Sequence, residues 1–267
     1  MTRLEAVKAG NTIGERLALD EARFSTVRRR QHVLAIGAHP DDVELGIGGI
    51  LAAHVAVGDF ITILTMSDGV NGGTPAQRRD EAQMAADLLG AVLITQDLVD
   101  SEICADVVTI RIIEAVIAQC EPDIIYTHSA ADTHQDHRSI HFATVAAGRT
   151  VAGLYCYGAP SLTHDFNPVR FNDIEENLEF KLNLLKCFES QQHRYYFEPE
   201  LIIAKARYWG SVGRWRFAEP LEVVHERSPG HVELTGYVER RVASIHSSND
   251  DEPQQHPSRV GAAAYSG

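Results

Sequence analysis

The chain contains 267 residues, 44% of them hydrophobic, which is enough to bury the core of one large α/β domain. Its formal net charge of −13 argues against nucleic acid or an anionic membrane as a partner, because both attract clustered lysine and arginine. The N-terminus is acidic and lacks the apolar centre of a signal peptide, and no run has the length of a membrane-spanning helix. We therefore expect a cytoplasmic protein without membrane insertion. The four cysteines stand far apart, which predicts free thiols.

Short β-branched segments alternate with longer segments of helical period along the chain. This alternation predicts a Rossmann-like α/β sandwich, in which helices flank a mostly parallel sheet. Strands are expected over 32–38, 60–66, 91–96, 123–128, 153–158 and 221–226, and helices over 44–57, 75–89, 106–120, 137–148 and 175–190. The domain is expected over 31–245, after an N-terminal helical extension in 1–30 and before a flexible polar tail in 246–267.

Polar segments follow four of the expected strands at the point where each strand ends. They read HPDD (39–42), SDGVNGG (67–73), DLVDSE (97–102) and HSAADTHQDH (128–137). Ligands of parallel α/β sheets bind beyond the carboxyl ends of the strands, so these four loops are expected to line one crevice. The active site is predicted there.

The HPDD segment has the spacing of half a metal site. Positions i and i+3 of a turn share a side, so His39 and Asp42 could hold one ion while Asp41 points elsewhere. Three protein ligands that leave a position open for water are typical of a catalytic zinc site. The third ligand is expected from the histidine-rich loop after the fourth strand.

Spacing alone leaves that third ligand open. His134 and His137 are three residues apart, whereas His137 and His141 are four apart, so His137 is common to both pairs. His128 closes a predicted strand, which favours a core histidine bonded to the backbone. A phosphate-binding loop is excluded for ELGIGG (44–49), because its glycines lack the required order and no Lys-Ser/Thr follows. Gly48 and Gly49 are instead expected to permit close helix packing.

The string AHPDDVELGIGG (38–49) together with HQDH (134–137) resembles the PIG-L, or LmbE-like, family of zinc-dependent N-deacetylases. RRDEAQMAADLLG (78–90), FNPVRFNDI with KCFESQ (166–191) and RYWGSVGRWRFAEPLEV (207–223) are similar to further segments of that family. The resemblance covers residues 31–225. It implies the removal of an N-acetyl group from an N-acetylglucosamine-type sugar or glycoconjugate, as in natural-product biosynthesis.

The resemblance also implies a role for each conspicuous residue. The zinc ligands would be His39, Asp42 and His137, the catalytic residues Asp41 and His134, the outer carboxylate Asp136, and the substrate-binding residues Arg78 and Asp100, with Arg79 as a near alternative to Arg78. Zinc can lower the pKa of water to about 7 and polarise the amide carbonyl. Asp41 would then act as general base, and His134 would stabilise the oxyanion or protonate the leaving amine.

Two other functions fit parts of the same pattern. His39 and Asp41 with a distant histidine also match the facial triad of a non-haem Fe(II) oxygenase, although such enzymes are usually built on antiparallel β-folds. Fe²⁺ is accordingly an alternative metal. A non-catalytic sugar-binding protein of the same fold would have lost the base or a ligand, but these residues are all present. The sequence leaves a homo-oligomer open, because no apolar stripe identifies an interface.

Overall fold

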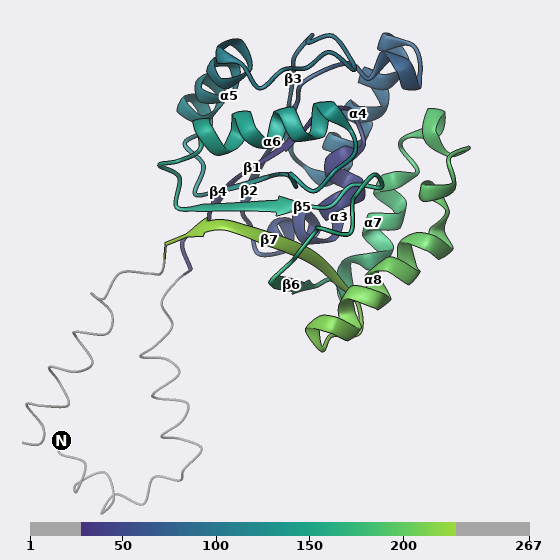
Figure 1. Ribbon diagram of the computed structural model, residues 1–267. Helices are drawn as coiled ribbons and strands as arrows, with labels where there is room; N and C mark the ends of the chain where they lie inside the picture. Colours follow the sequence, from purple (N-terminus) through teal and green to yellow (C-terminus); the bar gives the residue numbers. More distant parts are fainter. Residues whose placement is uncertain (1–27, 228–267) are drawn as a thin grey trace, which may run out of the picture. The chain divides into compact units, whose positions relative to one another are not determined.

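The sheet of the molecule has seven strands in the order β3-β2-β1-β4-β5-β7-β6. The computed structural model describes residues 28–227 (Figure 1). The first five strands in this order pair in parallel, whereas β7 pairs antiparallel with both β5 and β6. The strands are β1 (His32–Gly37), β2 (Phe60–Thr65), β3 (Val92–Thr95), β4 (Ile124–His128), β5 (Gly153–Tyr157), β6 (Arg170–Asp173) and β7 (Ala218–Glu226).

Helices cover both faces of this sheet. They are α3 (Asp42–Ala56), α4 (Pro75–Leu89), α5 (Val107–Cys120), α6 (Gln135–Ala147), α7 (Leu178–Leu185) and α8 (Pro199–Gly213), with short 3₁₀ turns at Val70–Gly72, Glu175–Asn177, Glu189–Gln191 and Tyr195–Phe197. α5 and α6 pack together on one face, and α3, α7 and α8 lie on the other (Figure 1). No helix within residues 28–227 is both long and apolar enough to cross a membrane.

The predicted α/β sandwich with a mostly parallel sheet is confirmed. The elements that differ from the prediction lie in the C-terminal part of the described residues. β6 and α8 were not predicted, and the helix expected over 175–190 is a 3₁₀ turn followed by the shorter α7. β6 is difficult to predict from the sequence because it has only four residues and pairs with β7 alone. α7 ends where Lys186, Cys187 and Phe188 donate to carbonyls three residues back, which tightens the chain into a turn. The predicted extension in 1–30 lies almost wholly, and the tail in 246–267 entirely, outside the described residues.

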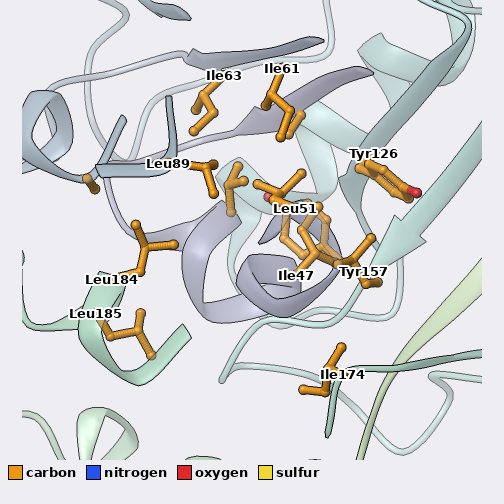
Figure 2. Close-up of a cluster of buried hydrophobic side chains, with 14 of the residues drawn as sticks. Ile47, Leu51, Ile61, Ile63, Leu89, Tyr126, Tyr157, Ile174, Leu184 and Leu185 are labelled. Carbon is orange, nitrogen blue, oxygen red and sulfur yellow. The ribbon is translucent and has the colours of Figure 1, made fainter. Parts of the chain in front are cut away.

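Strand β1 shows why the core has two halves. Val33 and Ala35 face the cluster beneath α3, whereas Leu34 and Ile36 face the cluster beneath α5 and α6, and all four are buried. A strand covered on both faces needs an unbroken apolar sequence, which residues 33–36 supply. Figure 2 shows the α3 half, where Ile47 and Leu51 meet side chains from the sheet and α7.

Helix α3 is interrupted within its glycine-rich segment. Ile47 has φ −138° and ψ 21°, which are not helical values, so backbone groups around it lose their intrahelical partners. The Glu219 carboxylate of β7 accepts from the N–H groups of Gly49 (3.1 Å) and Ile50 (2.7 Å). Lys181 of α7 donates to the carbonyl of Leu45 (2.7 Å) and forms a buried ion pair with Glu219. The break is thus satisfied by one ion pair from the C-terminal part of the domain.

The glycines of this segment allow neighbours to approach the helix backbone. A Cβ at Gly49 would lie 2.8 Å from Ile174, and a Cβ at Gly48 would lie 3.3 Å from Lys181. The expected role of these two glycines in close packing is therefore confirmed. Gly46 is the tightest position of the three, because its Cβ would lie 2.3 Å from the ring of Tyr157.

Gly46→Ala is expected to lower the free energy of unfolding by about 1–3 kcal/mol, the usual cost of overpacking a core. The Tyr157 ring is fully buried and its hydroxyl donates to the Ile36 carbonyl at 2.8 Å, so it has little freedom to move aside. Urea unfolding would measure the change. Gly73→Ala is the matched control, since its added Cβ meets only ordinary contacts from 3.4 Å outward. Equal midpoints for the two variants would contradict this packing.

Candidate active site

A cavity of about 470 Å³ lies where the four polar loops meet, as predicted from their positions after the strands. We call it the main pocket. Its lining includes His39, Asp41, Asp42, Gly69, Asn71, Arg78, Asp100, Ser101, His134, His137, Ser161, Gln191, Arg194 and Tyr196. All eight predicted site residues except the buried Asp136 therefore line this one cavity.

The HPDD loop directs its two aspartates apart. Asp41 has φ 93°, a left-handed backbone conformation that aspartate tolerates better than most residues, and Asp42 begins α3 directly after it. The Asp42 carboxylate accepts from the His39 backbone N–H at 2.8 Å, which closes the turn. Neighbours in sequence thus face different surroundings, as expected from the spacing.

The three predicted ligands lie next to one another. Asp42 stands between two imidazoles: its Oδ2 is 3.3 Å from His39 Nδ1, and its Oδ1 is 3.4 Å from His137 Nε2. Three sets of potential ligands have donor atoms within 4.8 Å of one another, namely His39 with His134 and His137, Asp42 with His128 and His137, and His39 with Asp100 and Asp136. His39 and His137 each belong to two of these sets and Asp42 belongs to one, and no set contains all three predicted ligands.

Carboxylates orient both histidines from behind. Asp132 Oδ2 lies 3.0 Å from His137 Nδ1, which leaves Nε2 directed at Asp42. His39 Nε2 lies 3.2 Å from Asp136 and 3.3 Å from Asp100, which leaves Nδ1 directed at Asp42. Such carboxylate–histidine pairs are typical of metal sites, where they fix the tautomer and the ring orientation. Asp136 therefore lies behind His39 rather than behind its sequence neighbour His137.

Asp41 and Arg78 form a buried pair at the edge of the pocket. Arg78 donates to the Asp41 carboxylate at 3.0 Å and also to the carbonyl of Pro40. Burial raises the pKa of the Asp41 carboxyl to about 7, although the neighbouring guanidinium opposes this rise. A carboxylate with such a pKa can both take and release a proton near neutral pH.

His134 is held as a neutral donor. It is the N-cap of α6, and its Nδ1 accepts from the backbone N–H of Asp136 at 3.2 Å. Its Nε2 must then carry the proton of the neutral ring. Burial and the neighbouring His137 lower the pKa of His134, which favours that neutral form. The ring stacks on His137 with 4.5 Å between centroids, so it lines the pocket beside the predicted ligands.

The charges around the pocket fit a bound cation. Five carboxylates are buried close to His39 and His137, namely those of Asp41, Asp42, Asp100, Asp132 and Asp136. Among the lysines and arginines in the described part of the chain, Arg78 alone forms an ion pair with one of these carboxylates, that of Asp41. Two imidazole nitrogens and a carboxylate facing each other are ligands that zinc and iron both accept. The donor set and the charge balance therefore fit a divalent metal ion.

The other histidines have distinct places. His128 is fully buried and its Nε2 accepts from the Ala38 backbone N–H at 3.1 Å, the core role that its sequence position favoured. It also lies 3.2 Å from Asp42, while its Nδ1 has no partner in the described residues. His141 belongs to none of the ligand sets within the described residues, and its Nδ1 lies 2.9 Å from the carbonyl of His128.

The two predicted substrate-binding residues are already engaged by the protein. Arg78 is buried against Asp41, and Asp100 accepts from the Asn71 backbone N–H at 2.8 Å while facing His39. Both line the main pocket, so their contact with substrate stays a prediction. Arg79, the near alternative to Arg78, is half exposed and pairs with Asp68 at 2.8 Å outside the pocket lining.

Comparison with known proteins identifies the family. The family model for GlcNAc-PI de-N-acetylase, PIG-L, matches residues 34–148. The Escherichia coli protein described as uncharacterized deacetylase YaiS is 32% identical over 195 residues, which cover 64% of this chain and 98% of that protein. The chain belongs to the PIG-L family.

Two further relatives of this PIG-L chain are named for different reactions. Diacetylchitobiose deacetylase of Thermococcus kodakarensis is 26% identical over 229 residues, covering 75% of this chain and 85% of that enzyme. 4-Oxalmesaconate hydratase of Pseudomonas putida is 26% identical over 208 residues, which cover 66% of this chain and 80% of that enzyme. The crystal structure of the conserved protein TT1542 from Thermus thermophilus shares the fold, with a TM-score of 0.68 and 24% identity over 76% of this chain and 98% of that one.

Several residues in or behind the main pocket of this PIG-L chain were not singled out from the sequence. Asp132 orients His137, but DTHQDH contains two aspartates and only Asp136 was chosen. Gln191, Arg194 and Tyr196 reach the main pocket from 3₁₀ turns after α7. These turns have no periodic pattern to place them. The density of basic and aromatic residues in HRYYF (193–197) is the signal that could have marked them.

Asp132→Asn is expected to weaken metal binding about 10–100-fold, the usual effect of changing a carboxylate behind a metal-bound histidine. The asparagine oxygen can still accept from His137 Nδ1–H, so ring orientation survives while the ligand becomes less basic. Competition with a fluorescent zinc chelator would measure the affinity. Asp106→Asn is the control, because Asp106 caps α5 and asparagine caps equally well. A wild-type affinity for Asp132→Asn would remove Asp132 from the site.

Proposed function

We propose that this protein is a metal-dependent hydrolase that removes an N-acetyl, or other N-acyl, group from an N-acetylglucosamine-type sugar or a metabolite containing one. The arrangement of the two adjacent aspartates carries the proposal. Asp42 stands between two histidines, while Asp41 belongs to none of the ligand sets in the described residues and lines the same pocket. The matched deacetylases support the same chemistry.

In this proposal His39, Asp42 and His137 would hold a divalent ion, with zinc as the first candidate and Fe²⁺ as the second, because the Asp42 carboxylate contacts both imidazoles. Such an ion, when bound, lowers the pKa of water and polarises the amide carbonyl. All three of these residues line the main pocket, where a substrate amide can enter.

The side chains of the chain itself supply the proton transfers. Asp41 takes a proton from the attacking water, whose oxygen forms a bond to the amide carbon. The Nε2–H of His134 donates to the carbonyl oxygen as that oxygen becomes negative. The C–N bond then breaks, and the proton taken by Asp41 passes to the amine nitrogen. The products are acetate and the free amino sugar, and Arg78 keeps Asp41 in place throughout.

Two alternative functions fit this arrangement of side chains less well. An oxygenase triad would need Asp41 as a metal ligand, but that carboxylate pairs with Arg78 at 3.0 Å. The hydratase relative raises a different alternative, the addition of water to a carbon–carbon double bond. Both alternatives can be separated from amide hydrolysis by their products.

Amine release from a panel of N-acetylated sugars tests the proposal. The panel includes N-acetylglucosamine, its glycosides, N,N′-diacetylchitobiose and an N-acetylated pseudodisaccharide. Metal-stripped protein is compared with protein reloaded with Zn²⁺ or Fe²⁺, and 4-oxalmesaconate is included as the hydratase substrate. We expect acetate and free amine in equal amounts from the reloaded protein alone. Hydration of 4-oxalmesaconate without amine release, or turnover that consumes O₂, would reject the proposal.

A further inference from the structure

A second cavity, of about 340 Å³, adjoins the main pocket. Leu45, Pro160 and Tyr196 line both cavities, so the two spaces share a wall. A molecule that reached from the main pocket into the second cavity would pass these three residues. We call this second space the aromatic pocket.

Aromatic side chains from two elements form one side of the aromatic pocket. Trp209 of α8 meets Phe166 edge-to-face, with ring centroids 5.9 Å apart and planes at 82°. Tyr208 contacts the same indole at 4.8 Å and also lines the pocket. Rings held by one another offer apolar surface at little cost in side-chain entropy, which favours a flat or alkyl group of the ligand.

The charged groups of the aromatic pocket are not balanced. Lys181 and Glu219 neutralise each other, and Glu219 is further occupied by the α3 backbone. Lys205 of α8 is exposed and also lines the pocket, and its side chain makes no hydrogen bond or ion pair within residues 28–227. The surrounding protein partly desolvates the Lys205 ammonium and, together with the nearby Lys181, lowers its pKa, so a negative partner would be favourable there. The pocket thus combines apolar walls with one unpaired cation.

We propose that the aromatic pocket binds the aglycone of the substrate, an aromatic or alkyl group that carries a carboxylate or phosphate. The inference rests on the proposed deacylation, because it places the amide of the same molecule in the main pocket. Trp209 and Phe166 contact the apolar body, and Lys205 pairs with the anion. A free monosaccharide leaves these contacts unused and is therefore a poor substrate.

Three glycosides of N-acetylglucosamine test this assignment through their kcat/KM values: methyl, phenyl and 4-carboxyphenyl. The phenyl glycoside should exceed the methyl glycoside by about tenfold or more, the gain expected from burying a ring. The 4-carboxyphenyl glycoside should exceed the phenyl glycoside. Lys205→Gln should abolish only the carboxylate advantage, and Trp209→Ala should abolish the phenyl advantage, each ratio being taken against the same variant's kcat/KM on the methyl glycoside. Lys186→Gln, an exposed lysine after α7, should change none of these ratios.

Equal kcat/KM values for the three glycosides would overturn the inference. So would a preference for N-hexanoyl over N-acetyl methyl glycoside that Trp209→Ala removes, because the acyl chain would then occupy the pocket. Direct binding of 4-phenylbutyrate separates this inference from the proposed function. If wild type and Lys186→Gln bind it and Lys205→Gln does not, the pocket assignment is supported even where no amine is released. Absence of that binding in folded wild-type protein would reject the pocket.

Discussion

Asp41→Asn is expected to lower kcat on an N-acetylated amino sugar about 10²–10⁴-fold, the contribution that a positioned general base typically makes. The substitution keeps the size of the side chain and removes its ability to take a proton. Asparagine tolerates the left-handed backbone at φ 93° and can still accept from Arg78, so the loop should keep its shape. The bound metal should stay, because Asp41 lies outside the ligand sets.

Steady-state kinetics and metal content of the same preparation check this prediction. Asp87→Asn makes the same chemical change on the exposed face of α4 and should leave both quantities unchanged. A kcat near wild type would show that another group takes the proton. Loss of metal together with activity would make Asp41 a ligand, as the facial-triad interpretation requires.

Asp42→Ala is expected to remove the metal and the activity together. Its carboxylate is the anionic group between His39 and His137, and it also closes the turn through the His39 N–H. Changes behind a ligand already cost about 10–100-fold in metal affinity, so deleting the ligand should cost more than about 100-fold. Metal analysis after dialysis, together with activity after added Zn²⁺, would measure both effects.

Two controls separate this loss from unfolding. Asp80→Ala removes an exposed carboxylate of α4 and should keep full metal content. Wild type stripped by a chelator should lose activity and regain it on reloading, while its circular dichroism stays constant. If the Asp42→Ala protein retains stoichiometric metal, Asp42 is not a ligand, whatever the activity of the variant.

The parallel part of the fold could be predicted because its signals are local. Residues 33–36 are apolar without interruption, as a strand buried on both faces requires, and Gly90 ends α4 in a left-handed conformation. β6 and α7 could not be placed in the same way. Their limits depend on pairing with β7 and on a 3₁₀ turn after Leu185, which tertiary contacts decide.

The candidate site likewise contains residues that the sequence could predict and residues that it could not. The spacing of His39 and Asp42 follows from one turn, and the position of HQDH after a parallel strand brings His137 to the same edge. Asp132 could not be distinguished from Asp136, because the choice depends on which imidazole each carboxylate reaches in space. Arg194 belongs to a segment without helical or strand period, so the sequence could mark HRYYF (193–197) as unusual but could not show that Arg194 reaches the main pocket.

The interruption of α3 determines how short a folded fragment that contains the candidate site can be. The family match ends at residue 148, yet the helix that begins with Asp42 has its internal gap closed by Lys181 and Glu219. A fragment of residues 34–148 would contain every predicted ligand and the predicted base, but its backbone would lack both partners. Shortened versions of this enzyme should therefore be cut no earlier than the end of β7 at Glu226.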